Sequence, residues 1–167
     1  IARDLLQDGL NFRAVYRGNI PRHMADIADR IDWFEGDILD LPEMSQAMEG
    51  VDTVIHCAAV VSFDRRDKAK LYEVNVEATR NLVNIAINQS VSQFIYISST
   101  GALPKTAVRD ELDETRKWEP SALNTYYGYT KYLGELEVWR GLVEGLNVLI
   151  LNPSVILGPG EPGRSSA

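Results

Sequence analysis

The sequence predicts an α/β fold in which a parallel sheet is covered by helices on both faces. Short apolar runs alternate along the chain with longer stretches whose apolar residues repeat at helical spacing. This alternation is typical of parallel sheets whose strands are joined by right-handed helical crossovers. An apolar share of 45 % can fill a core, and 167 residues correspond to one domain or a large part of one.

The expected elements can be placed in order along the chain. The first residues have the pattern of the back half of a helix, which Gly9 closes. Asp40 suits a helix N-cap, with Pro42 in the first turn and Gly50 beyond the end. The remaining expected elements are strands at 12–16, 31–35, 51–59, 94–97 and 146–151, helices at 21–30, 68–89 and 126–144, and a loop at 101–124.

The two longest expected helices each carry an apolar stripe. In 68–89 the stripe consists of Leu71, Val74, Ala78, Leu82, Ile85 and Ala86. In 126–144 it consists of Leu133, Leu136, Trp139, Leu142 and Val143. Helical spacing places the members of each stripe on one face, so we expect both faces to pack against the core.

Composition excludes several classes of function. A net charge of −7 and the absence of a basic stripe argue against nucleic-acid binding. No apolar run is long enough for a membrane span, so no membrane partner is expected. Two histidines and one cysteine make a zinc site improbable, and no metal is expected. The single Cys57 suits a reducing compartment, and no export signal is visible, so we expect a cytoplasmic protein.

The most informative residues are Tyr127 and Lys131, with Ser99 upstream. Tyr127 and Lys131 lie four residues apart, which places them on one face of a helix. An ammonium group beside a phenol favours the phenolate, which makes the tyrosine a better acid or base. A nearby serine hydroxyl can bond the substrate oxygen whose proton moves. The three residues together indicate a proton-transfer site.

Further landmarks accompany this group in a consistent order. They are Gly36-Asp37-Ile38, Val54-Ile55-His56-Cys57-Ala58-Ala59, Tyr72-Glu73-Val74-Asn75-Val76, Tyr96-Ile97-Ser98-Ser99-Thr100, Tyr127-x-x-x-Lys131 and Asn152-Pro153-Ser154-Val155 with the residues up to Gly160. The set resembles the extended short-chain dehydrogenase/reductases, the group of NAD(P)-dependent epimerases, dehydratases and dihydroflavonol-reductase-like enzymes. The resemblance covers nearly the whole chain and implies a doubly wound Rossmann-type sheet.

The resemblance also implies roles for individual residues. Tyr127 would be the catalytic acid/base, Lys131 its partner, Ser99 the catalytic serine, and Asn75 the motif asparagine near the active site. The implied cofactor-binding residues are Arg17, Asp37, Ile38, Ala58, Ala59, Asn75, Tyr127, Lys131, Pro153 and Val155. Within this set, Asp37 and Ile38 would hold the adenine ring, and Pro153 and Val155 would lie beside the nicotinamide.

Two departures from the family pattern bear on activity. The Gly-x-x-Gly-x-x-Gly turn and the first strand of the family are absent, so the sheet should have an empty position between the strands at 12–16 and 51–59. Those glycines let the backbone approach the cofactor diphosphate. The part that binds substrate would follow Gly160. We therefore expect a partial dinucleotide-binding domain over 1–167, cut from a longer enzyme and inactive alone.

The expected function is hydride transfer between a nicotinamide cofactor and a secondary alcohol or ketone. Arg17 ends its strand where NAD-preferring relatives tend to carry an acidic residue, and a guanidinium suits a 2′-phosphate, so NADP is favoured and NAD stays possible. Two alternatives remain: a nucleotide-sugar epimerase or dehydratase, and a non-catalytic nucleotide-binding regulator. The expected partners are a small-molecule substrate and a second copy, paired through helices 68–89 and 126–144.

Overall fold

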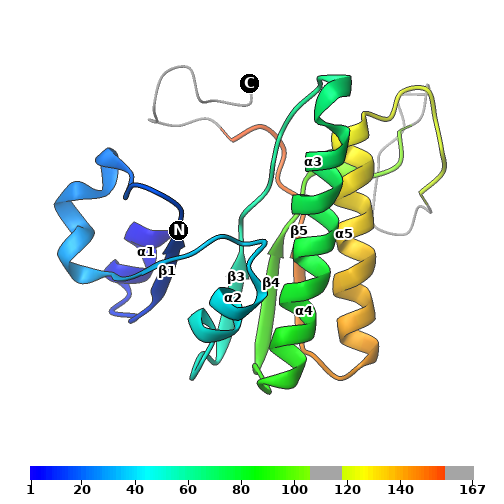
Figure 1. Ribbon diagram of the computed structural model, residues 1–167. Helices are drawn as coiled ribbons and strands as arrows, with labels where there is room; N and C mark the ends of the chain where they lie inside the picture. Colours follow the sequence, from blue (N-terminus) through cyan, green and yellow to red (C-terminus); the bar gives the residue numbers. More distant parts are fainter. Residues whose placement is uncertain (106–117, 157–167) are drawn as a thin grey trace.

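Five parallel strands form two separate sheets in the computed structural model, which describes residues 1–105 and 118–156 (Figure 1). The strands are β1 (Arg13–Tyr16), β2 (Asp32–Glu35), β3 (Thr53–His56), β4 (Gln93–Ile97) and β5 (Val148–Leu151). β1 pairs with β2, and β4 lies between β3 and β5. All the expected strands are present, although the expected 51–59 strand is shorter and ends at His56.

The break between the two sheets falls where the sequence predicts an empty position. Within the described ranges, no strand pairs with β1 on its second edge or joins it to β3. Figure 1 shows β1 and α1 set to one side of the β3–β4–β5 sheet. The neighbour that would complete a doubly wound order is therefore not supplied by any described strand.

The helical segments connect the strands in the expected order. They are α1 (Ala2–Gln7), η1 (Arg22–Arg30), α2 (Leu41–Ala47), η2 (Arg65–Asp67), α3 (Lys68–Tyr72), η3 (Glu73–Glu77), α4 (Ala78–Asn88), η4 (Thr100–Ala102) and α5 (Tyr126–Val143). The predicted cap of α2 is confirmed, because the Asp40 carboxylate accepts a hydrogen bond from the Glu43 amide at 3.0 Å. The expected helix at 21–30 is the 3-10 helix η1.

The expected 68–89 helix is one continuous helical stretch with a change of winding in its middle. The segment η3 is a π-helix, placed between the α-helical segments α3 and α4. All six residues of the predicted apolar stripe are buried, which confirms the face that packs on the core. π-helical turns inside α-helices often occur at functional sites.

The helices pack against the strands from two sides, α1 and η1 from one and α2, α4 and α5 from the other. The larger core joins α2, α4 and α5 to the buried side chains of Phe94 and Tyr96 on β4. A smaller core packs α1 and η1 against β1 and β2. Neighbouring residues of β2 point to opposite faces, because Trp33 packs on the smaller core and Phe34 on the larger one.

The predicted apolar stripe of α5 is wrong as a core face. Leu136, Trp139, Leu142 and Val143 are exposed, and Leu133 is only partly buried. The buried face of α5 consists instead of Gly128, Thr130, Lys131, Gly134, Val138 and Gly141. Close packing explains this, since a β-carbon on Gly134 would lie 2.7 Å from the Asn75 carbonyl oxygen. None of the helices in the described part of the chain has the length and apolar character of a bilayer span.

Candidate active site

Predicted site residues follow the carboxyl ends of all five strands. They are Arg17 after β1, Asp37 and Ile38 after β2, Ala58 and Ala59 after β3, Ser99 after β4, and Pro153 and Val155 after β5. In parallel sheets with helices on both faces, ligands bind outside these ends of the strands. In Figure 1 the carboxyl ends of β3, β4 and β5 point upward, in the direction of the ends at which α3 and α5 begin. The fold therefore gathers the predicted residues along one edge.

Arg17 and Asp37 form an ion pair at the ends of β1 and β2. The Arg17 Nη1 atom lies 2.9 Å from Asp37 Oδ2. The Leu39 amide donates to the other carboxylate oxygen at 3.0 Å, and this bond, together with Arg17, lowers the pKa of Asp37. The Arg17 side chain is 68 % exposed, so its remaining N–H groups are accessible to a ligand. Ile38 behind the pair is partly buried against the larger core.

Ser99 and Tyr127 converge around Gly101. The Ser99 hydroxyl accepts a hydrogen bond from the Gly101 amide at 3.0 Å and caps η4. A β-carbon on Gly101 would lie 3.3 Å from Ser99 Oγ and 3.8 Å from Tyr127 Cε1. Both side chains therefore lie within reach of one point after the end of β4. Sequence analysis placed them together, and the geometry agrees.

The start of α5 sets the position of Tyr127. Thr125 caps the helix by accepting from the Gly128 amide at 3.0 Å, which leaves Tyr127 in the first turn. The Tyr127 ring packs edge-on against Phe63, with 6.3 Å between ring centroids. Phe63 is 70 % exposed, and sequence analysis missed it. An aromatic residue in the irregular segment after β3 was the signal that could have identified it.

Lys131 lies one turn further along α5, with its amine buried at the end of β4. Its Nζ donates to the Ile97 carbonyl oxygen at 2.8 Å and lies 4.1 Å from the centre of the Tyr96 ring. Burial lowers the pKa of Lys131 to about 8, although the nearby Glu135 opposes this shift. Among the described residues, no hydrogen bond joins Lys131 to Tyr127. The structure therefore brings the amine to the predicted strand end and bonds it to the backbone there.

Asn75 lies in the π-helical segment η3 and bridges two elements. Its Oδ1 accepts from the Val60 amide at 2.8 Å, and its Nδ2 donates to the Val60 carbonyl oxygen at 2.9 Å and to Thr130 Oγ1 at 3.1 Å. Both amide hydrogens are thus committed to protein atoms, and the side chain is buried. In this arrangement Asn75 fixes the segment after β3 against α5 and acts on the site through that segment.

Asn152 and Glu135 form a hydrogen-bonded chain to the backbone of Ser99. Sequence analysis gave neither residue a role. The Asn152 Nδ2 atom donates to the Ser99 carbonyl oxygen at 3.1 Å and to Glu135 Oε1 at 2.6 Å. Asn152 follows β5 directly, and Glu135 follows Lys131 by one helical turn. These bonds hold the backbone of the serine against both elements.

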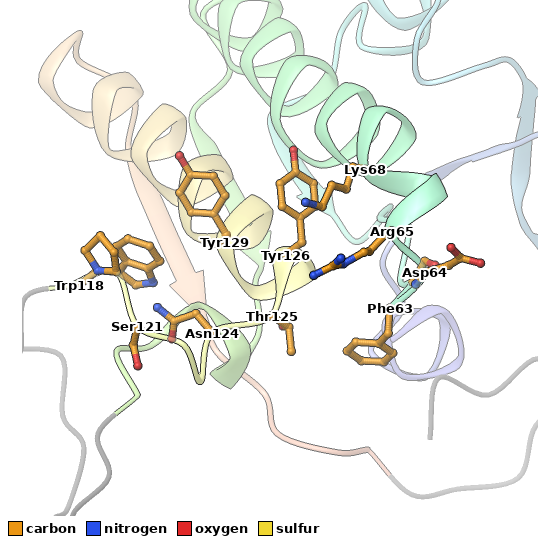
Figure 2. Close-up of a pocket in the computed structure, with 12 residues that line it drawn as sticks. Phe63, Asp64, Arg65, Lys68, Trp118, Ser121, Asn124, Thr125, Tyr126 and Tyr129 are labelled. Carbon is orange, nitrogen blue, oxygen red and sulfur yellow. The ribbon is translucent and has the colours of Figure 1, made fainter.

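A cavity of about 660 Å³ opens between the segment after β3 and the start of α5 (Figure 2). Its lining residues are Ser62, Phe63, Asp64, Arg65, Lys68, Trp118, Pro120, Ser121, Asn124, Thr125, Tyr126 and Tyr129. Ser99, Tyr127 and Lys131 do not line it, but Phe63 does, and its ring contacts Tyr127. The cavity therefore adjoins the Ser99–Tyr127 pair and extends away from it between the segment after β3 and the start of α5.

Comparison with known proteins identifies the family. The model of the "NAD dependent epimerase/dehydratase family" matches residues 1–167. The chain belongs to this family. Its relatives include reductases and dehydrogenases of the short-chain dehydrogenase/reductase superfamily, and its structural neighbours share the Rossmann fold. The sequence-based prediction of family and fold is confirmed.

Two curated relatives and one crystal structure illustrate the similarity. The chain is 32 % identical over 165 residues to sterol demethylase protein B of Methylococcus capsulatus, covering 95 % of this chain and 48 % of the relative. It is 28 % identical over 173 residues to cinnamoyl-CoA reductase 1 of Petunia hybrida, covering 95 % and 51 %. A short-chain dehydrogenase/reductase superfamily protein from Agrobacterium tumefaciens with bound NAD has a TM-score of 0.76 at 27 % identity, covering 90 % and 44 %. The chain thus spans about half the length of these proteins.

Proposed function

We propose that the protein is an NAD(P)-dependent oxidoreductase that interconverts a secondary alcohol and a ketone. The observation that carries the proposal is the convergence of Ser99 Oγ and the Tyr127 ring around Gly101, at the end of the strand that also receives Lys131. Proton transfer requires an acid or base close to the reacting oxygen, and a hydroxyl beside it can stabilise the charge that develops there.

Each residue of the group has a distinct task in this proposal. Tyr127 gives its phenolic proton to the substrate oxygen as a ketone becomes an alcohol, and takes it back in the reverse direction. Ser99 hydrogen-bonds the same oxygen, and Lys131 holds a positive charge at the end of β4, one helical turn from Tyr127. With a pKa of about 8, Lys131 is mostly charged at neutral pH. A bound nicotinamide cofactor supplies or accepts the hydride.

The described residues leave room for a dinucleotide along the segment after β3, but they lack the glycine-rich turn that would hold its diphosphate. Ala58 and Ala59 are small and exposed after β3, which lets a cofactor approach the backbone there. The sequence contains no Gly-x-x-Gly-x-x-Gly turn, and the position between β1 and β3 is empty in the described structure. We propose that a longer protein supplies this strand and turn, and that turnover belongs to that full-length protein.

Cofactor turnover separates the proposed oxidoreductase from its main alternative. An oxidoreductase should consume NADPH in proportion to the ketone it reduces, as followed by absorbance. A nucleotide-sugar epimerase or dehydratase returns its cofactor to the starting state, so it would convert substrate without net oxidation of NADPH. The family is named for epimerases and dehydratases, whereas relatives such as cinnamoyl-CoA reductase 1 are named as reductases. Substrate conversion with no net cofactor oxidation would refute the oxidoreductase proposal.

We also propose that the enzyme prefers NADPH, because the exposed Arg17 guanidinium can pair with a 2′-phosphate. Arg17→Ala should reduce kcat/KM for NADPH about tenfold and change kcat/KM for NADH little, since a charged hydrogen bond is lost with only one of the two cofactors. The measurement is steady-state kinetics of the full-length protein with each cofactor. Arg22→Ala, at an exposed arginine of η1, serves as the control. An equal loss with both cofactors would show that Arg17 only supports the fold.

The exposed apolar face of α5 favours a second copy of the chain as a partner. Leu136, Trp139 and Leu142 are each more than 40 % exposed and recur at helical spacing. Exposed apolar clusters of this kind are typical of interaction surfaces. We propose a homodimer through α5 and the adjoining α4, and we expect Trp139→Glu to yield monomers in sedimentation equilibrium. Val155→Glu, at an exposed apolar residue elsewhere, should leave the dimer intact; a monomeric unmodified protein would contradict the proposal.

A further inference from the structure

Aromatic rings surround the cavity beside Tyr127. Phe63, Tyr126, Tyr129 and Trp118 all line it, and Figure 2 shows them on two sides of the same opening. Trp118 is fixed by parallel stacking on Tyr132, with 4.6 Å between ring centroids and 9° between the ring planes. The volume of about 660 Å³ lies within the range of sites for small organic ligands. These walls favour a ligand with a flat apolar body.

Two positive charges lie at the same cavity. Arg65 and Lys68 both line it, and no described carboxylate lies within 4 Å of either. The neighbouring Asp64 is occupied elsewhere, since its carboxylate pairs with Arg66 at 2.6 Å. Lys68 Nζ lies 5.0 Å from the centre of the Tyr126 ring, which places its charge over one of the aromatic walls. In a chain of net charge −7, such a site is locally positive.

Two buried polar atoms of the lining residues have no hydrogen-bond partner. They are Trp118 Nε1, which can only donate, and Asn124 Oδ1, which can only accept. Both residues line the cavity on the side opposite Arg65 in Figure 2. Buried polar atoms are nearly always hydrogen-bonded, and an exception calls for an explanation. A ligand with polar groups at its edge would offer partners to both atoms after a small side-chain adjustment.

From these features we infer that the cavity binds the substrate as a planar aromatic ketone or alcohol that carries a carboxylate. The inference rests on the proposed function, because the carbonyl end of the substrate must extend past Phe63 and out of the cavity to reach the Ser99–Tyr127 pair, which does not line it. Phe63 contacts Tyr127 and has no hydrogen-bonding group, so the ring of the substrate nearest the reaction should be aromatic. The carboxylate then reaches Arg65 and Lys68.

Binding of a matched pair of probes tests this inference without cofactor or turnover. The probes are 6-acetyl-2-naphthoate and its uncharged analogue 2-acetylnaphthalene, titrated into the 167-residue chain by calorimetry. We expect the carboxylate to bind about tenfold more tightly, since it gains charged hydrogen bonds. The difference in affinity between the two probes should become smaller in about 0.5 M salt, because screening weakens exposed ion pairs. Equal affinities for the two probes would overturn the inference.

Variants locate the binding site on the structure. Arg65→Gln with Lys68→Gln should reduce the affinity for the carboxylate to that of the uncharged probe. Arg22→Gln with Lys70→Gln is the matched control, because these exposed cations do not line the cavity. Phe63→Ala, at an exposed side chain, should weaken the binding of both probes without loss of folding. A similar effect of the control pair, or no effect of Phe63→Ala, would place the binding elsewhere.

Two outcomes separate this inference from the proposed function. If the naphthoate binds but the full-length protein never reduces it or any other ketone with NADPH, the site stands and the oxidoreductase proposal fails. If the full-length protein reduces uncharged ketones while the naphthoate has no advantage in binding, the oxidoreductase proposal stands and this inference fails. Tighter binding of UDP-glucose than of the naphthoate would also overturn the inference, in favour of a nucleotide-sugar site.

Discussion

A Tyr127→Phe variant of the full-length protein is expected to lose nearly all turnover while keeping its fold and its affinity for ligands. General acid/base groups contribute roughly 10²–10⁴-fold to a rate, and phenylalanine removes only the hydroxyl that carries the proton. The ring and its edge-on contact with Phe63 are retained, since that contact involves no hydroxyl. The measurement is kcat for NADPH-dependent ketone reduction, with ligand affinity determined separately.

Tyr132→Phe is the matched control for this variant. Tyr132 lies on the same helix, does not line the cavity, and makes its principal contact through ring stacking on Trp118, which phenylalanine preserves. Its kcat should stay close to that of the unmodified protein. If Tyr127→Phe also turns over at the unmodified rate, Tyr127 is not the acid/base, and the role proposed for the Ser99–Tyr127 pair fails with it.

The convergence of Ser99 and Tyr127 could be predicted from the sequence because it follows from a rule of topology. Parallel strands place the residues after their carboxyl ends along one edge, so a serine after β4 and a helix that begins near the same edge must meet. The empty position between β1 and β3 could be predicted from the resemblance to the family, because the first strand and the glycine-rich turn of the family are absent from the sequence.

The packing of α5 could not be predicted in the same way. The apolar stripe through Leu136 and Trp139 suggested a core face, but the helix packs through the face that contains Gly134 and Gly141. A β-carbon on Gly141 would lie 2.8 Å from Val83 Cγ1, so the absence of a side chain permits the close approach of α4. Hydrophobic periodicity does not detect a buried helix face that consists of small residues, because such residues contribute little apolar character.

The residues that support and extend the site depend on tertiary contacts that leave little trace in the sequence. Asn152 reaches Ser99 and Glu135 from a different strand and helix, at sequence separations of 53 and 17 residues. Arg65 comes from η2 and Trp118 from the segment before α5, and the fold brings both to the same cavity. A single sequence without a distinctive local motif does not reveal such pairs. The Tyr127–Lys131 pair could be recognised because its spacing is local, whereas the cavity has no such local pattern.

The stability of the fold is expected to fall steeply in acid because of one buried histidine. His56 is 4 % exposed, at the end of β3, with Nε2 2.9 Å from Thr79 Oγ1. Burial, together with the nearby positive charge of Lys131, lowers the pKa of His56 to about 3. In the unfolded chain a histidine takes up its proton near the ordinary value of about 6.5. Between these two values the unfolded state binds a proton that the folded state does not.

The free energy of unfolding must therefore decrease as the pH falls from about 6.5 towards 3. Above about pH 6.5 neither state binds the proton, so His56 no longer makes the stability depend on pH there. The slope is about 1.4 kcal/mol per pH unit, so His56 should account for about 3 kcal/mol between pH 7 and roughly 4. Urea unfolding at both pH values measures it. His56→Gln keeps a polar group near Thr79 but does not titrate, so its stability should depend less on pH by that amount. His23→Gln, at the exposed second histidine, is the control and should behave like the unmodified chain. If the unmodified chain, His56→Gln and His23→Gln all show the same pH dependence, buried His56 does not control stability in acid.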